Sequence, residues 1–184
     1  MTDTSGVGTP LDLTIDNASA VTWISGGLSV NSATLIQSAG AATKVITASQ
    51  ATNEITLETW IDPVNLSQSS PIVTLSQQSN KRNFTLSQNG NRWDGRLRTT
   101  NTNQQGSSLA SPSGTATLNL THVVYTRDAA GSVRIYLDGV ESASTTLSGS
   151  FSSWVSSYKL GLVNELTSGD PWLGDLYLVA IYNR

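Results

Sequence analysis

The sequence has no cysteine, one histidine, one methionine and few charged residues, which make up 12% of its 184 positions. The absence of cysteine excludes disulfide bonds, thiolate metal sites and cysteine nucleophiles. Ten lysines and arginines give a formal net charge of −3, which argues against a duplex nucleic acid partner, because that partner requires a basic surface. No apolar run approaches the roughly 18 residues of a transmembrane helix, so we expect no membrane span.

Short runs rich in β-branched and aromatic residues follow one another from residue 55 onward, and each ends at glycine, asparagine, aspartate or proline. This pattern predicts an all-β protein. The predicted strands cover residues 55–61, 72–76, 84–87, 95–100, 121–127, 133–137, 158–163 and 173–182. Alternation of apolar and polar residues over 11–15 predicts a leading strand, and helix is expected for at most one or two turns near 41–50.

The predicted strands are joined by segments with the chemistry of tight hairpin turns, in which glycine or asparagine supplies a positive φ. These segments are residues 88–91, 94–95, 128–131 and 138–139. They predict antiparallel pairing. The length fits one domain, which we place at residues 11–184, with residues 1–10 as a tail.

Four segments, taken in order, carry a family resemblance: ITLETWIDP at 55–63, THVVYTR at 121–127, RIYLDGV at 134–140, and PWLGDL with AIYNR at 171–184. Together they resemble the laminin-G-like domains of the concanavalin A-like lectin/glucanase superfamily. The resemblance covers about residues 20–184 and implies a two-sheet antiparallel jelly-roll sandwich with a concave sheet. Members typically continue a few residues further, which implies either a domain from a longer chain or assembly or one that ends at its last strand.

The superfamily includes lectins, adhesion modules and glucan hydrolases, so the fold alone does not determine the function, which has to be inferred from the site residues. Glycoside hydrolysis needs two carboxyl groups that flank the scissile bond. The Glu-x-Asp-x-x-Glu string of the glucanase members is absent here, and the chain has only four glutamates, so we expect no enzyme. A carboxylate pair from distant strands stays open. The single histidine, His122, is expected to be a structural strand residue.

Sugar binding needs aromatic rings for the apolar sugar face and planar polar groups for the hydroxyls. Such residues gather between positions 81 and 106 and again near 164–172. The candidate ligand-binding residues are Arg82, Asn83, Trp93, Arg96, Arg98, Asn101, Asn103, Asn164, Glu165 and Trp172. One alternative is core packing of the tryptophans at positions 23, 60, 154 and 172. Others are that Arg96 and Arg98 pair with Asp94 or Glu58, and that loop 101–106 is a solvated connection. The basic cluster could also bind an anionic glycan through bidentate arginine contacts.

Calcium is the metal that this fold often carries, and it requires oxygen ligands. Candidate oxygens are those of Asp16 and Asn17 near the first strand and Asp175 near the last. Adjacent terminal strands would bring them together, whereas the alternative is that these side chains cap turns.

Our first hypothesis is a non-catalytic carbohydrate-binding or adhesion module that uses the concave sheet and its rim loops. The alternative is a protein-interaction or structural module of a larger surface or particle assembly, and the second alternative is a glycoside hydrolase. The expected partner is a glycan or a cell-surface protein. The resemblance implies an extracellular or cell-surface location, although residues 1–5 lack the features of a signal peptide.

Overall fold

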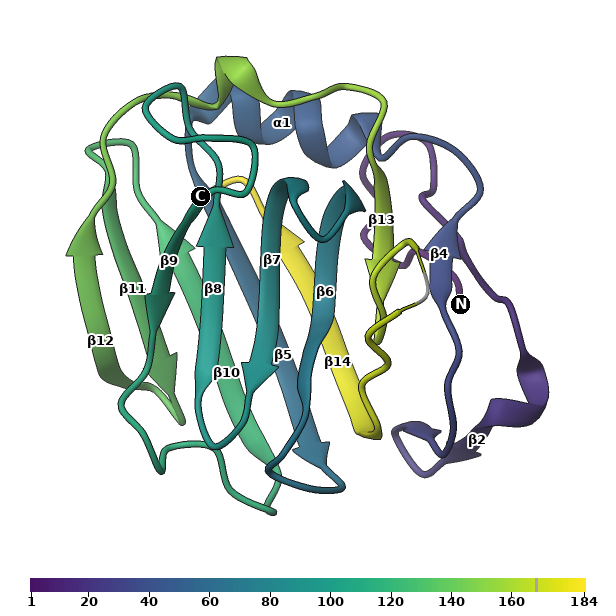
Figure 1. The fold of residues 1–184 in the computed structure, drawn as a ribbon. Helices are drawn as coiled ribbons and strands as arrows, with labels where there is room; N and C mark the ends of the chain where they lie inside the picture. The colour runs from purple at the N-terminus through teal and green to yellow at the C-terminus, as the bar shows by residue number, and fades with distance from the viewer. Residues whose placement is uncertain (168) are drawn as a thin grey trace.

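A computed structural model describes residues 1–167 and 169–184 and consists of two antiparallel sheets of seven strands packed face to face (Figure 1). Sheet A has the strand order β1 (Leu13–Ile15), β4 (Ile36–Ser38), β13 (Lys159–Leu162), β6 (Ser69–Gln78), β7 (Lys81–Asn89), β8 (Trp93–Leu97) and β9 (Ser107–Ala110). Sheet B has the order β12 (Val140–Thr146), β11 (Ser132–Leu137), β10 (Thr121–Arg127), β5 (Ile55–Pro63), β14 (Gly174–Tyr182), β3 (Gly27–Val30) and β2 (Val21–Ile24). The predicted all-β two-sheet sandwich is confirmed.

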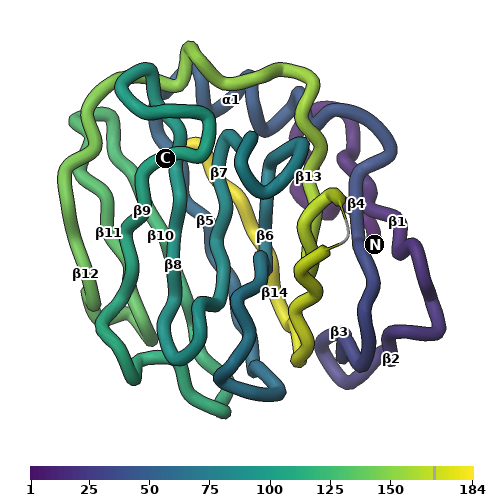
Figure 2. Tube along the Cα trace, in the orientation of Figure 1, coloured from purple at the N-terminus to yellow at the C-terminus, as the bar shows by residue number. Residues whose placement is uncertain are grey.

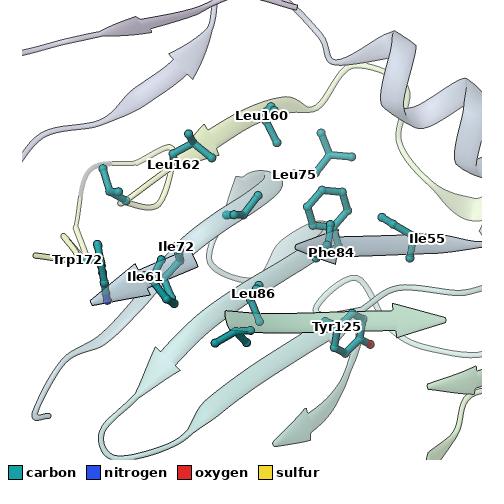
Figure 3. Close-up of a cluster of buried hydrophobic side chains, with 14 of the residues drawn as sticks. Ile55, Ile61, Ile72, Leu75, Phe84, Leu86, Tyr125, Leu160, Leu162 and Trp172 are labelled. Carbon is teal, nitrogen blue, oxygen red and sulfur yellow. The ribbon is translucent and has the colours of Figure 1, made fainter. Parts of the chain in front are cut away.

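Period-two alternation places one face of each central strand in the core. In β5 the side chains of Ile55, Leu57 and Ile61 are buried, while the intervening residues point outward. Its neighbour β10 follows the same pattern, and Tyr125 lies opposite Leu57 in the antiparallel register. Figure 3 shows side chains from the two sheets gathered in this core, among them Leu75, Phe84, Leu86, Ile55, Ile61 and Tyr125.

The outer face of sheet A is also covered, because the segment between β13 and β14 folds back onto it. Figure 2 shows this segment lying alongside β13. Gly161 in β13 leaves the space, since a Cβ atom there would lie 2.5 Å from Cδ2 of Leu166. Thr74 and Ser76 in β6 and Thr85 in β7 are therefore at most 1% exposed, although they point away from the core. This covering segment shapes the site described below.

One α-helix, α1 (Thr43–Thr52), closes one end of the sandwich, at the top of Figure 1. It is longer than the one or two turns predicted. Its N-cap residue, Ala42, makes no side-chain capping bond, and Ile46 is buried in the core, so packing stabilises this helix more than its local sequence does. Two short 3₁₀ helices, η1 (Ala18–Ala20) and η2 (Phe151–Ser153), complete the regular structure. None of the described helices is long and apolar enough to cross a membrane.

The N-terminal segment, which we predicted to be a tail, is held against the sandwich. The Asp3 carboxylate accepts a hydrogen bond from the Leu11 amide at 2.8 Å and pairs with the Lys44 ammonium of α1 at 2.5 Å. The hydrogen bond from Lys44 is the main reason why the pKa of Asp3 lies well below its usual range. Residues 1–10 contain no strand or helix.

Most predicted strands lie within two or three residues of their positions, but one predicted turn is wrong. Asp94 and Gly95 lie inside β8, and the turn that precedes it covers residues 89–92. Gly95 is needed for packing instead, because Tyr125 of sheet B approaches the backbone at this position. By contrast, Asp138 and Gly139 have φ values of 51° and 82° and form the predicted hairpin turn between β11 and β12. Strands β2, β3, β4, β9 and β12 were not predicted.

Replacing Gly95 by alanine is expected to destabilise the fold by about 1–3 kcal/mol through overpacking. The new Cβ atom would lie 2.1 Å from Cδ2 of the Tyr125 ring, and this ring is buried between two packed sheets. Urea unfolding measures the change. The control is Gly40→Ala, where nothing lies within 4 Å of the added methyl group, so a shift of less than about 0.5 kcal/mol is expected. Equal stability of the two variants would contradict this account of Gly95.

Candidate functional site

Two neighbouring hollows lie on the outer side of sheet A, at the covering segment. The mixed-charge hollow, of about 190 Å³, is lined by residues of β6, β7 and β8 and of the covering segment. The basic hollow, of about 500 Å³, is lined by residues of β4, β6, β7 and β13 and of three loops. The charged residues of the mixed-charge hollow are Arg82, Asp94, Arg96, Glu165 and Asp170. Those of the basic hollow are Lys81 and Lys159.

An irregularity in strand pairing brings Arg82 into the mixed-charge hollow. Leu75 lies opposite Phe84, but the next residue of β6, Ser76, lies opposite Arg82 instead of Asn83. Such a bulge re-aims side chains, and Arg82 consequently lies on the same side of the sheet as the hollow. Burial lowers the pKa of its guanidinium, and the nearby Glu165 carboxylate opposes this shift. The Nε atom of Arg82 is buried and has no hydrogen-bond partner among the described residues.

Asp94 and Arg96 enter the same hollow from β8, where their separation of two residues places them on one face. The Nε atom of Arg96 lies 3.4 Å from Oδ2 of Asp94. The hydroxyl of Ser108, which lies opposite Arg96 in β9, donates a hydrogen bond to the other carboxylate oxygen of Asp94. The Asp94 carboxylate is thus held in place, whereas about a third of the Arg96 side chain is exposed and available to a ligand.

Glu165 links the covering segment to sheet A by a hydrogen bond. It is 2% exposed, and its Oε1 atom accepts hydrogen bonds from the Ser76 hydroxyl and, at 3.0 Å, from the Leu166 amide. Asn164 fixes the same segment: its amide nitrogen donates to the Thr34 carbonyl at 3.0 Å, and its Oδ1 atom accepts from the amides of Glu165 and Asp170. The two residues therefore set the position of the covering segment.

The two tryptophans among the candidates, which were predicted to contact a ligand, have no exposed ring with which to do so. Trp93 and Trp172 are both 0% exposed and belong to the hydrophobic core. Trp172 instead supports the rim of the mixed-charge hollow, because its indole nitrogen donates to Oε1 of Gln88 at 2.8 Å. Gln68 donates to the same oxygen and accepts from the Leu173 amide. Both rings fill the core, which was the alternative stated for Trp172.

The remaining candidates lie at or outside the edges of the hollows. Asn83 is 0% exposed, and its side-chain amide donates to the Val155 carbonyl at 3.1 Å and accepts from the Val155 amide at 2.9 Å. Arg98 lines neither hollow, and its carbonyl accepts from the Trp154 indole. Asn101 and Asn103 stabilise their own loop and its contact with Ser148. From this loop it is Gln104, not singled out before, that lines the basic hollow.

The structure therefore brings together three of the ten candidates, Arg82, Arg96 and Glu165, in one hollow. The same hollow also contains Asp94, which was considered only as an ion-pair partner of the arginines, and Asp170, which was not considered. The basic hollow was missed because Lys159 is far from Lys81 in the sequence. Strand pairing joins them: Lys159 lies opposite Ser76, next to the β6–β7 hairpin that carries Lys81.

The arrangement predicted for calcium is not present. The terminal strands are not neighbours, because β1 pairs with β4 in sheet A, whereas β14 pairs with β3 and β5 in sheet B. Asp16 accepts hydrogen bonds from Gln37, and Asn17 caps η1. Asp175 lies opposite Asp62, where burial and the charge of Asp175 raise the pKa of Asp62.

Across residues 1–167 and 169–184, no three histidine, cysteine or acidic side chains converge as a metal site would require. Asp16, Asn17 and Asp175 thus do not fit a calcium ion as a set. Calcium binding elsewhere stays a prediction.

The outer face of sheet B carries a different cluster. The exposed Trp60 ring stacks on His122, with 4.7 Å between centroids. A nitrogen of His122 lies 2.9 Å from Oε1 of Glu58, and the Tyr182 hydroxyl donates to Oε2 at 3.0 Å. This hydrogen bond raises the pKa of Tyr182. His122 is thus a strand residue with a structural hydrogen bond, as expected.

A family model described as the concanavalin A-like lectin/glucanases superfamily matches residues 37–184. Among curated proteins, no sequence matches the chain.

Solved structures match over most of the chain at low sequence identity. The sialidase CBM40 of Ruminococcus gnavus bound to α2,3-sialyllactose has a TM-score of 0.66 and 14% identity, over 86% of this chain and 90% of that one. A structure of botulinum neurotoxin type C, whose cell entry depends on interaction with two ganglioside molecules, has a TM-score of 0.71 and 12% identity. The match spans all of this chain and 45% of that one. A pentraxin of Limulus polyphemus has a TM-score of 0.55 and 14% identity, over 72% and 65% of the two chains. These likenesses establish the fold.

Replacing Ser76 by alanine is expected to destabilise the protein by about 1–3 kcal/mol, because the buried Glu165 carboxylate would lose a donor. Hydrogen exchange of the Leu166 amide, which donates to the same carboxylate, should become faster as the covering segment loosens. The control is Ser69→Ala on the same strand, where the hydroxyl is exposed. Unchanged exchange at Leu166 in the Ser76 variant would show that this bond does not hold the segment.

Proposed function

The chain belongs to the concanavalin A-like lectin/glucanases superfamily, and we propose that it is a non-catalytic glycan-binding module whose ligand lies on the outer side of sheet A. The observation that carries this proposal is the convergence of Arg82, Asp94, Arg96 and Glu165 in one hollow. Guanidinium and carboxylate groups offer planar sets of donors and acceptors, and these match the hydroxyls of a sugar ring.

The described lining of the mixed-charge hollow contains no aromatic side chain, so hydrogen bonds rather than ring stacking would hold the sugar. The guanidinium groups of Arg82 and Arg96 supply donors at this hollow, and each N–H group that meets a ligand oxygen adds a charge-assisted hydrogen bond. Asp94 and Glu165 already accept hydrogen bonds from serine hydroxyls. They suit a fixed binding surface better than a pair of carboxyl groups that exchanges protons with a substrate.

The known ligands of similar structures support the same reading. The R. gnavus CBM40 was solved with sialyllactose, and the type C neurotoxin depends on gangliosides. Glycans of this kind are presented outside cells, so we place the module extracellularly or at a cell surface. We further propose that it acts within a longer chain or assembly, since a single shallow site binds weakly and gains from multivalency.

A glycan array screened with the purified chain tests the proposal, once with calcium and once with a chelator. Arg82→Ala and Arg96→Ala are each expected to weaken binding to any glycan hit by about tenfold or more, because charge-assisted hydrogen bonds are lost. Arg134→Ala is the control, since Arg134 belongs to sheet B and pairs with Asp128 and Glu141. Loss of binding in chelator would establish a calcium requirement.

An array without hits, obtained with folded protein, would overturn the proposal. It would favour the protein-interaction alternative instead, for which the exposed Trp60 on sheet B would be the first position to mutate.

A further inference from the structure

The basic hollow is unusual in this acidic chain. Its described lining contains two lysines, Lys81 and Lys159, and no aspartate or glutamate, whereas the chain as a whole has a formal net charge of −3. The ion pairs formed among residues 1–167 and 169–184 involve neither lysine. Both residues are half-buried.

The two hollows share a wall. Lys81 and Arg82 are consecutive residues, and each lines a different hollow. Ser76 lines the basic hollow and donates its hydroxyl proton to Glu165, which lines the mixed-charge hollow. Across the strands, Ser76 lies between Lys159 on β13 and Arg82 on β7. A ligand that extends past Glu165 would therefore contact both hollows.

The described charged residues give the two hollows net charges of opposite sign. The mixed-charge hollow has three carboxylates, those of Asp94, Glu165 and Asp170, against two guanidinium groups. An acidic sugar would meet an excess of like charge there, whereas an uncharged sugar finds both donors and acceptors. The basic hollow offers two cations that no described carboxylate neutralises, together with the amides of Gln77 and Gln104.

The basic hollow also has a surface for a sugar ring. Val155, Tyr158 and Leu166 contribute apolar atoms to its lining, and its volume of about 500 Å³ lies within the usual range of small-molecule sites. The mixed-charge hollow is smaller, at about 190 Å³. Size and lining together therefore place the larger, charged unit of a ligand over the lysines.

We propose that the ligand is an acidic oligosaccharide, with an uncharged unit in the mixed-charge hollow and a carboxylate- or sulfate-bearing unit in the basic hollow. This inference rests on the proposed function and specifies its ligand class. The lysines would act as point charges on the anionic group, whereas Arg82 and Arg96 would hold the uncharged unit by hydrogen bonds.

The test measures the affinity of the full chain for matched pairs of ligands. One pair is a uronic-acid oligosaccharide and its carboxyl-reduced form, and the other is an O-sulfated oligosaccharide and its desulfated form. In at least one pair the acidic member is expected to bind about tenfold more tightly at low ionic strength, and salt should reduce this advantage. The pair that shows the preference identifies the anionic group as carboxylate or sulfate.

The double variant Lys81→Gln/Lys159→Gln should lower the affinity for the acidic member to that of the neutral one and leave the neutral affinity unchanged. Lys81→Arg/Lys159→Arg should keep the preference. The charge-matched control is Arg134→Gln/Arg184→Gln, which removes two cations from the sheet B side of the chain. Thermal unfolding verifies that each variant is folded. If the double glutamine variant does not fold, the single variants Lys81→Gln and Lys159→Gln are measured instead.

Equal binding of both members of each pair would overturn this inference and leave the proposed glycan-binding function standing. Equal loss in the lysine variant and the charge-matched control would also overturn it, because net charge alone would then explain the preference. No binding of any of the four oligosaccharides, together with an array without hits, would overturn both.

Discussion

The buried carboxylate of Glu165 on the outer side of sheet A is the interaction on which the site depends. A charge with 2% exposure is costly unless donors surround it, and here the Ser76 hydroxyl and the Leu166 amide provide them. These bonds hold the segment between β13 and β14 against the sheet. Because the segment crosses the face at this point, it divides what would be one open surface into two hollows of different charge.

The rest of the fold supports this placement from both sides. On the core side, Leu160 and Leu162 of β13 pack into the sandwich, while Gly161 between them leaves room for Leu166 on the outside. At the far end of the segment, Trp172 enters the core and its indole bonds to Gln88. The covering segment is thus anchored near its start by Glu165 and near its end by the buried Trp172.

Local pattern was enough to predict the strands that carry the fold, because alternation in β5 and β10 is strict and the hairpin residues Asp138 and Gly139 have the required positive φ. Gly95 was misread, since its role is to admit the Tyr125 ring from the other sheet, which no local pattern reveals. For the site, residue type correctly selected Arg82, Arg96 and Glu165. It could not show that Trp93 and Trp172 fill the core. Nor could it bring Lys159 near Lys81, because that proximity depends on the order of the strands in the sheet.

The outer faces of the two sheets carry similar polar residues but differ in how fully these residues pair with one another. On sheet B, each carboxylate oxygen of Glu58 has a partner, in His122 and Tyr182, and the Trp60 ring stacks on His122. The polar groups of this cluster thus bond to one another. On sheet A, the Nε atom of Arg82 has no partner in the described structure, and Lys81 and Lys159 form no described ion pair. Because Lys81 and Lys159 line a hollow without a described carboxylate, a ligand that supplies acceptors and negative charge interacts favourably with them. This asymmetry, more than the fold that the chain shares with many proteins, is the physical reason to place the ligand on sheet A.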